Sequence, residues 1–102
     1  MFTIFAKVSA DGNLLAGSGV TEVSRFGQGR YNLSTDRDIS GCALIGTVNS
    51  LDANTDVGPG NSSILVAPVD GTTLFIRTAT PSAESPKHVD DDRPFSVAVL
   101  GE

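Results

Sequence analysis

The chain has 102 residues, the length of one ordinary domain. Val, Ile, Leu and Phe make up 28 of these residues, above the ~20% below which chains tend to stay disordered, so a hydrophobic core is expected. Twelve acidic residues against seven basic ones give a net charge of −5, the wrong sign for electrostatic binding to the phosphates of a nucleic acid. Composition therefore excludes a disordered tail and a basic nucleic-acid-binding domain.

Residues 2–9 alternate between apolar and polar side chains, the period of a half-buried strand. Phe5 is the exception, because it lies on the outer face and is a candidate contact with a neighbouring chain. The Asp11-Gly12 dipeptide that follows favours a tight hairpin turn, since glycine readily adopts the positive φ that such turns need. The inward face of this strand is predicted to carry Phe2, Ile4, Ala6 and Val8.

A second hairpin is predicted over residues 20–34. Residues 20–26 form an extended run, and Gly27-Gln28-Gly29 turns the chain back. The returning strand, residues 30–34, is expected to face inward with Tyr31 and Leu33.

Three further strands are predicted between residues 42 and 78. Residues 42–49 are apolar on both faces, which is typical of a central strand covered on two sides, with another subunit as one candidate cover. Residues 63–69 and 72–78 form a hairpin through Asp70-Gly71. Pro68 beside that turn indicates an edge strand or a strand end.

The chain closes on a strand in which Phe95, Val97 and Val99 alternate with smaller side chains. No segment has a convincing helical period, and Pro86 interrupts the one candidate. Seven or eight short strands predict a single all-β domain over residues 1–102, an antiparallel sandwich or jelly-roll-like fold. Long loops are expected at about residues 50–62 and 79–92, and loops of this length often carry binding residues.

Two acidic segments deserve a test as metal sites. Asp52, Asn54 and Asp56 have the alternate spacing of a calcium loop, but Val57 stands where that loop needs glycine and Ser63 where it needs a bidentate glutamate. An Asx-rich turn is the favoured interpretation, and a small calcium-dependent binding module remains an alternative.

The second acidic segment combines His88 with Asp90, Asp91 and Asp92. Zinc sites normally use more His or Cys ligands, so a solvated acidic loop is favoured, and whether either segment ever binds a metal stays open. We assign no metal-ligating and no cofactor-binding residues.

Catalytic patterns are also weak. Carboxylates flank arginine in residues 36–38 and again in residues 90–93, where structural ion pairing is the favoured interpretation over a hydrolase pair. Asp92 is expected to pair with Arg93 or to cap a turn, and Cys42 to be an inert buried thiol. We predict no catalytic residues, no cofactor and no enzymatic activity.

The N-terminus has neither a basic region nor a continuous apolar region, so we expect no signal peptide and synthesis in the cytoplasm. No apolar run reaches the ~18 residues that a membrane span needs, so no membrane insertion is expected. A virion or another assembled extracellular particle stays open as the final location.

Four segments form a familiar set of turns and strands: Gly-Ser-Gly-Val at 17–20, Gly-Arg-Tyr-Asn-Leu at 29–33, residues 36–43 and residues 92–99. They resemble a small β domain that recurs in uncharacterised bacterial and phage-like proteins, often after collagen-like or fibre-like stalks. The resemblance implies a knob-like terminal domain, expected to be a trimer, that serves assembly or surface contact and has no catalytic residues.

The sequence therefore predicts a non-enzymatic structural or attachment module that self-associates. One alternative is a decoration or cement subunit of a phage-like shell or filament. The expected partners are copies of this chain or subunits of a larger assembly. A surface receptor or glycan stays open, and nucleic acid is not expected.

Overall fold

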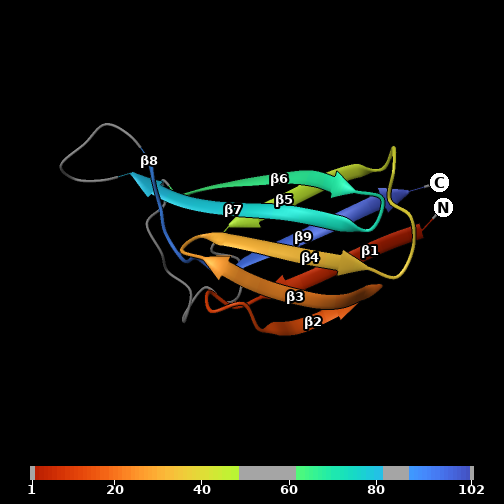
Figure 1. Ribbon diagram of the computed structural model, residues 1–102, viewed down its shortest axis with the longest axis horizontal. Coiled ribbons are helices and arrows are strands. Elements are labelled where there is room, and N and C mark those ends of the chain that lie inside the picture. The colour runs from red at the N-terminus through yellow and green to blue at the C-terminus, as the bar shows by residue number, and fades with distance from the viewer. Residues whose placement is uncertain (1, 49–61, 82–87, 102) are drawn as a thin grey trace.

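The computed structural model describes residues 2–48, 62–81 and 88–101. These residues form nine strands and no helix, and the strands make two antiparallel sheets packed face to face as a sandwich (Figure 1). The predicted all-β sandwich is confirmed.

The first sheet, sheet A, has the strand order β2-β1-β9-β5. Its central pair joins the two ends of the chain, because β1 and β9 run antiparallel from Phe2 opposite Gly101 to Val8 opposite Phe95. The strand bounds are β1 Phe2–Val8, β2 Leu14–Ser18, β9 Phe95–Gly101 and β5 Ala43–Val48.

The second sheet, sheet B, has the order β3-β4-β7-β6, with the short strand β8 also paired to β7. On one side of β7, Ala79 pairs with Ser63 of β6. β8 therefore pairs with the opposite side of β7, the side on which β4 lies, and uses residues of β7 that follow Arg77, the last one paired with β4. The strand bounds are β3 Val20–Gly27, β4 Arg30–Thr35, β7 Thr73–Pro81, β6 Ser63–Asp70 and β8 His88–Asp90.

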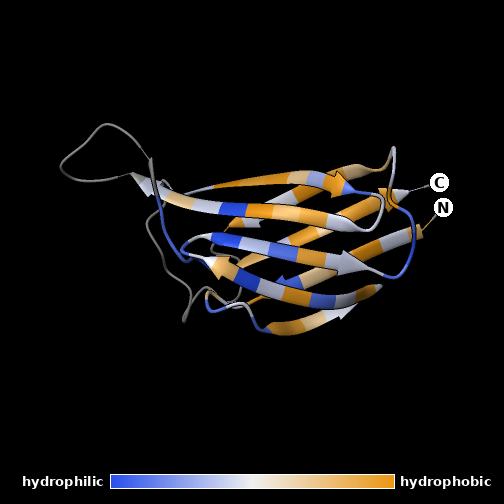
Figure 2. Cartoon of the chain, viewed as in Figure 1, coloured by the Kyte–Doolittle hydropathy of each residue, from blue (hydrophilic) through white to orange (hydrophobic). Residues whose placement is uncertain are grey.

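The core lies between the sheets and is built from alternate residues of the central strands. Figure 2 shows the resulting alternation along β3 and β4, whereas β6 and β9 are largely hydrophobic. Full burial of one large apolar side chain contributes roughly 1.5–3 kcal/mol, so these positions dominate the stability. The predicted inward pattern is confirmed, and the buried cluster contains Ile4, Ala6, Val8, Tyr31, Leu33, Ile39, Leu74, Ile76, Phe95, Val97 and Val99.

Two predicted turns are confirmed at glycines with left-handed backbone. Gly12 has a φ of 92° in the β1–β2 turn, and Gly29 has a φ of 69° in the β3–β4 turn. Gly29 is also tightly surrounded, because a Cβ at this position would lie 2.8 Å from Asp91 N and would clash with Thr78 O. Glycine is therefore required at residue 29 both by conformation and by space.

The prediction of a central strand at residues 42–49 is wrong. Among the described residues, β5 pairs only with β9 and forms an edge of sheet A. Its inner side is covered by β6, whose Val66 Cγ2 would lie 2.6 Å from a Cβ at Gly46, while its outer side chains are exposed. An apolar run indicates that both faces of a strand are hydrophobic, but it does not indicate whether the strand has one neighbouring strand or two.

The loop predictions have mixed outcomes. Of the loop predicted at 79–92, residues 79–81 belong to β7 and His88–Asp90 form β8, while residues 82–87 lie outside the described residues. Most of the loop predicted at 50–62 lies outside the described residues. Pro68 lies in β6, an edge strand of sheet B, as predicted.

Candidate functional site

The three consecutive aspartates are held against sheet B, and we call residues 90–92 the acidic strap. The carboxylate of Asp90 accepts hydrogen bonds from Arg77 Nε at 2.6 Å and from Arg30 Nε at 3.0 Å. The bond from Arg77 is the main cause that lowers the pKa of Asp90, and the bond from Arg30 adds to it against the opposing effect of burial. Asp90 thereby neutralises two outward-facing arginines of adjacent strands.

Asp92 links the strap to the β3–β4 turn. Burial acts to raise the pKa of its carboxyl, but hydrogen bonds from Arg25 and from the Gly29 amide outweigh burial, and the pKa is lowered. The Gly29 amide donates at 2.6 Å and Arg25 Nη2 lies 2.7 Å away. The expected turn cap is confirmed, and Arg25 of β3 forms an ion pair with the same carboxylate.

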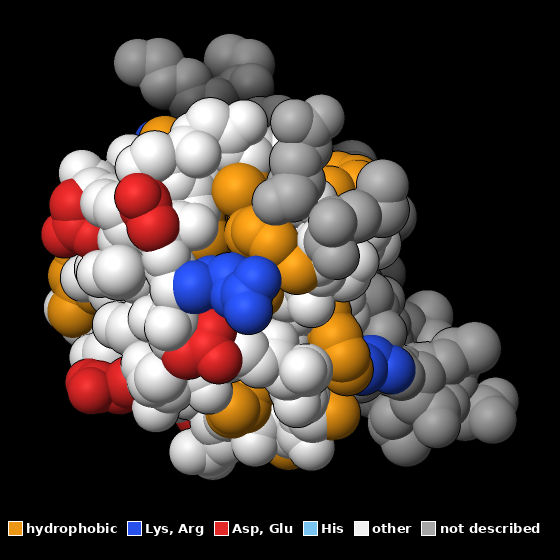
Figure 3. Space-filling model, turned by 90° about the vertical axis from the view of Figure 1, so that its right-hand side faces the viewer, with side chains coloured by type: hydrophobic (Ala, Val, Ile, Leu, Met, Phe, Trp, Pro, Cys, Tyr) orange, Lys and Arg blue, Asp and Glu red, His pale blue; other side chains and the backbone are white. Residues whose placement is uncertain are grey.

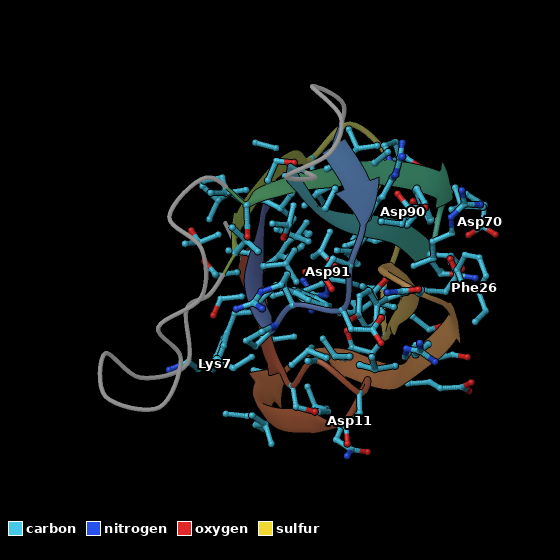
Figure 4. All side chains as sticks on the ribbon, turned by 90° about the vertical axis from the view of Figure 1, so that its left-hand side faces the viewer. Lys7, Asp11, Phe26, Asp70, Asp90 and Asp91 are labelled. Atoms are coloured by element: carbon cyan, nitrogen blue, oxygen red, sulfur yellow. The ribbon has the colours of Figure 1, made fainter. Side chains whose placement is uncertain are left out.

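The middle residue of the strap is fixed through β7. The Asp91 amide donates to Thr78 O at 3.1 Å, and Thr78 Oγ1 donates to Asp91 O at 2.6 Å. The Asp91 carboxylate accepts from Thr80 Oγ1 at 3.0 Å. In Figure 4 Asp91 lies inside the end of the sandwich and Asp90 lies toward its sheet B side. The predicted solvated acidic loop is thus, over residues 90–92, a structural brace.

Metal binding finds no geometric support in the described part of the chain. Within residues 2–48, 62–81 and 88–101, no three His, Cys, Asp or Glu side chains gather as a group that could hold a metal ion. The candidate ligands Asp52, Asn54 and Asp56 lie outside the described residues, as does the side chain of His88.

Tyr31 is a core residue, as its predicted inward orientation requires. Its ring meets that of Phe95 edge to face with centroids 4.9 Å apart, and its hydroxyl donates to Ala10 O at 2.6 Å. Burial, and next the charge of Asp92, raise the pKa of Tyr31 to about 12. The phenol is therefore neutral at ordinary pH and serves to join the core to the β1–β2 turn.

An open cavity of about 340 Å³ lies between the start of β5 and the end of β6. Cys42, predicted to be buried in a strand, instead precedes β5, is half-buried and lines this cavity. The one carboxylate in the lining belongs to Asp70, and it already accepts a hydrogen bond from Thr72 N at 2.9 Å. The lining does not hold the pair of carboxyl groups that acid–base hydrolysis needs.

The other acidic segment that was considered for catalysis lies between β4 and β5. The Arg37 guanidinium stacks over the ring of Phe2, 4.4 Å from its centroid, and Asp38 accepts from Ser40 N at 2.9 Å. The first contact fastens the connection from β4 to β5 against β1, and the second closes a local turn within it. The contacts of this segment are thus a ring contact and a turn cap, and not the ion pairing that was predicted for residues 36–38.

The outer surface of sheet A differs from that of sheet B in carrying few charges. Three rows of residues run across β1, β9 and β5, and strand alternation turns all of them away from the core. Lys7 is the one charged residue among the nine. We call this surface the sheet-A face; its rows are Phe5–Ala98–Ile45, Thr3–Leu100–Ala43 and Lys7–Ser96–Thr47.

The centre of the sheet-A face is hydrophobic and slightly hollowed. Phe5 and Ile45 are 43% and 52% exposed, and the small Ala98 lies between them in the register. The hollow there has a volume of about 180 Å³. From the end of the sandwich that carries both chain termini, the acidic side chains gather on the left, the side of sheet B, and hydrophobic ones flank the right (Figure 3).

The sequence indicated this surface through Phe5, the apolar exception in the first strand, and through the apolar run at 42–49, for which another subunit was one candidate cover. Ile45 was assigned to a covered central strand, so its exposure was missed. The continuous face becomes visible only once β1, β9 and β5 are known to be neighbours.

No family model, no curated protein and no solved structure matches the chain. In the described residues, no helix is long and apolar enough to cross a membrane.

Proposed function

We propose that this protein is a non-enzymatic structural or attachment module that self-associates through sheet A. The observation that carries the proposal is the sheet-A face, nine outward residues with one charge and a hydrophobic centre. Contiguous apolar surface on a small protein marks an interaction site more often than scattered single residues do. The resemblance to knob-like domains supports the same class of function and makes a trimer the expected assembly.

Energetics favour contact with another apolar surface. Phe5, Ile45 and Leu100 are each about half exposed, so covering them removes a substantial apolar area from water. The single charge, on Lys7, lies at one end of its row, so the centre of the face is covered without burying an ion.

Light scattering over a concentration series tests the proposal. We expect a mass above the 10.5 kDa of one chain that rises with concentration toward a defined oligomer, three chains if the resemblance holds. The double variant Phe5→Lys/Ile45→Lys should shift the association to at least tenfold higher concentration.

The matched control is Leu65→Lys/Val69→Lys, which adds the same charge at two exposed hydrophobic residues of β6 in sheet B. This control should associate as the wild type does. A 10.5 kDa species at every concentration would overturn self-association, and would direct the search to a larger preassembled lattice as the partner.

A further inference from the structure

Sheet B carries two arginines side by side on its outer surface. Arg30 of β4 and Arg77 of β7 are opposite each other in the register, and their side chains are 50% and 44% exposed. Like charges at opposite positions of adjacent strands repel each other. The carboxylate of Asp90 accepts one Nε–H bond from each arginine, on a different oxygen, and so holds the two guanidinium groups together as a pair.

The bonds to Asp90 leave most donors of this pair unused. A guanidinium group has five N–H donors, and Nε supplies one of them. Within residues 2–48, 62–81 and 88–101, Asp90 is the one residue that accepts a hydrogen bond from Arg30 or Arg77. The terminal nitrogens therefore remain for an acceptor from outside the chain, and the two terminal nitrogens of one guanidinium group match the two oxygens of a carboxylate.

The local charge of the arginine pair favours an anion. Asp90 brings one negative charge against two positive ones, which leaves a charge of +1. Of the other strap residues, Asp92 is paired with Arg25, and Asp91 lies inside the end of the sandwich (Figure 4). The chain as a whole has a charge of −5, but salt screens charges more than about 8 Å apart, so the groups next to a ligand decide its binding.

An aromatic surface adjoins the arginine pair. Phe75 lies two residues before Arg77 on the same face of β7, and Asn32 of β4 is opposite Phe75. The ring of Phe26, the residue before the last of β3, lies beside that of Phe75 with centroids 6.0 Å apart and is 54% exposed. We call this surface the sheet-B patch; its residues are Phe26, Arg30, Asn32, Phe75 and Arg77.

We propose that the sheet-B patch binds the uronic acid units of an acidic polysaccharide. A uronic acid combines a sugar ring with a C–H-rich face, hydroxyl groups around the ring and a carboxylate at its edge. The exposed ring of Phe26 offers a surface for the C–H face, the Asn32 amide both donates to and accepts from hydroxyl groups, and the terminal nitrogens of Arg77 bind the carboxylate. An inorganic anion has no ring, so it would use the arginines alone.

This inference goes beyond the proposed self-association and does not depend on it. The sheet-A face and the sheet-B patch are outer surfaces of opposite sheets, so association through sheet A leaves every sheet-B patch exposed. An oligomer would then present several patches to one polysaccharide and hold it more tightly than a single chain does. One chain already has a complete patch, so the two properties are tested separately.

The experiment is titration of the isotope-labelled wild-type chain with trigalacturonate, a trimer of a uronic acid, followed by NMR. We expect the amide signals of residues 24–32 and 73–77 and the Nε–H signals of Arg30 and Arg77 to shift until saturation, while those of β1 and β5 stay in place. The fully methyl-esterified trimer has the same sugar rings without the charge and should bind at least tenfold more weakly.

Variants separate recognition of the carboxylate from recognition of the ring. Arg77→Gln should weaken trigalacturonate binding at least tenfold, and Arg77→Lys, which keeps the charge but loses the paired donors, should not restore it. Phe26→Ala removes the exposed ring and should weaken trigalacturonate binding at least threefold without changing the binding of inorganic sulfate. Circular dichroism confirms that each variant folds.

The matched control is Lys7→Gln. It removes the same charge as Arg77→Gln, but Lys7 lies on the other side of the sandwich from Phe26 and Asp90 (Figure 4). Trigalacturonate binding should change less than twofold in this variant.

The failures are distinct. The absence of a saturable shift with trigalacturonate, or equal binding of the methyl ester, overturns the sheet-B patch as a uronic acid site. Binding that Phe26→Ala leaves unchanged and that inorganic sulfate matches would show an anion site only, which also overturns the proposal. A monomeric mass at every concentration overturns self-association and leaves the sheet-B patch in place.

Discussion

The outer surfaces of the two sheets use charge in opposite ways. On sheet B, Arg30 and Arg77 stand side by side on β4 and β7, and the Asp90 carboxylate binds both. On sheet A, the corresponding central strands carry Lys7 as the one charge of the sheet-A face. Both surfaces expose hydrophobic side chains, but on sheet B these are interspersed with ion pairs made within the chain, and Phe26 lies near Phe75 with ring centroids 6.0 Å apart.

This difference shows that the charges of sheet B serve the chain itself. The acidic strap bonds to β3, β4 and β7 and fastens one end of sheet B, whereas Lys7, the one charge of the sheet-A face, takes part in none of these bonds. Variants of the strap should therefore change stability, and variants of the sheet-A face should change association.

Gly29→Ala should produce the largest loss of stability. Gly29 has a positive φ, and its Cβ would clash with Thr78 O and lie 2.8 Å from Asp91 N, so the strap would have to move off the β3–β4 turn. Strain and lost hydrogen bonds together should lower the free energy of unfolding by about 3 kcal/mol or more. Urea unfolding measures this change.

Gly41→Ala is the matched control. Gly41 has a φ of 77°, close to that of Gly29, but nothing lies within 4 Å of the position of its Cβ. Gly41→Ala should therefore lower the free energy of unfolding only by the cost of placing alanine at a positive φ, about 1 kcal/mol. Equal losses at the two positions would contradict the idea that the strap braces the turn.

Asp92→Ala should be the next most damaging change. The carboxylate binds the Gly29 amide and Arg25, and its removal leaves a partly buried donor without that acceptor, at a cost of about 2 kcal/mol. Glu22→Ala, which removes an exposed charge from β3, should stay within about 0.5 kcal/mol of the wild type.

The same bonds give an acid dependence with a definite sign. The pKa values of Asp90 and Asp92 are lowered in the folded chain, so their contribution is present above the unfolded value, near 4, and is lost as the pH falls further. The free energy of unfolding of wild type should therefore decrease from pH 4 downward, and Asp92→Ala should reduce that slope. An unchanged slope in the variant would contradict the role of Asp92.

These contacts also show what could be predicted from the sequence. Period-two alternation located β1, β4 and β9 with their inward faces, and glycine-containing turns located the hairpins, because both signals are local. The strap was read as a solvated loop because its partners, Arg25, Arg30 and Arg77, lie 13 to 67 residues away in the chain.

The sheet-A face was missed for a related physical reason. Alternation identifies which side of a strand is hydrophobic, but the neighbours of a strand are set by long-range pairing that a single sequence does not encode locally. The apolar run at β5 therefore predicts a central strand covered on two sides, with another subunit as one candidate cover, whereas its place beside β9 at the edge of the order β2-β1-β9-β5 follows only from the structure.

Tyr31→Phe should have a smaller effect than the strap variants. It removes the hydrogen bond to Ala10 O while keeping the ring against Phe95, so we expect a loss of about 1 kcal/mol at neutral pH. Thermal unfolding with and without the hydroxyl measures it.

The hydroxyl also sets the alkaline limit of the wild type. The pKa of Tyr31 is about 12 in the folded chain and near 10 when unfolded, so above pH 10 the unfolded state loses its proton first and stability falls until about pH 12. In Tyr31→Phe this part of the decline should vanish. A decline identical in both proteins would mean that Tyr31 does not control it.

Phe5→Lys should have the smallest effect on the stability of the isolated chain, and this sharpens the contrast between the sheets most directly. Phe5 is 43% exposed on β1, and the long Lys side chain keeps its methylene groups against Ala98 while its ammonium group reaches water. Urea unfolding at a concentration where the chain is monomeric should then change by less than about 0.5 kcal/mol. A loss as large as that of Asp92→Ala would mean that the sheet-A face stabilises the fold itself, and that its hydrophobic residues need no partner to account for them.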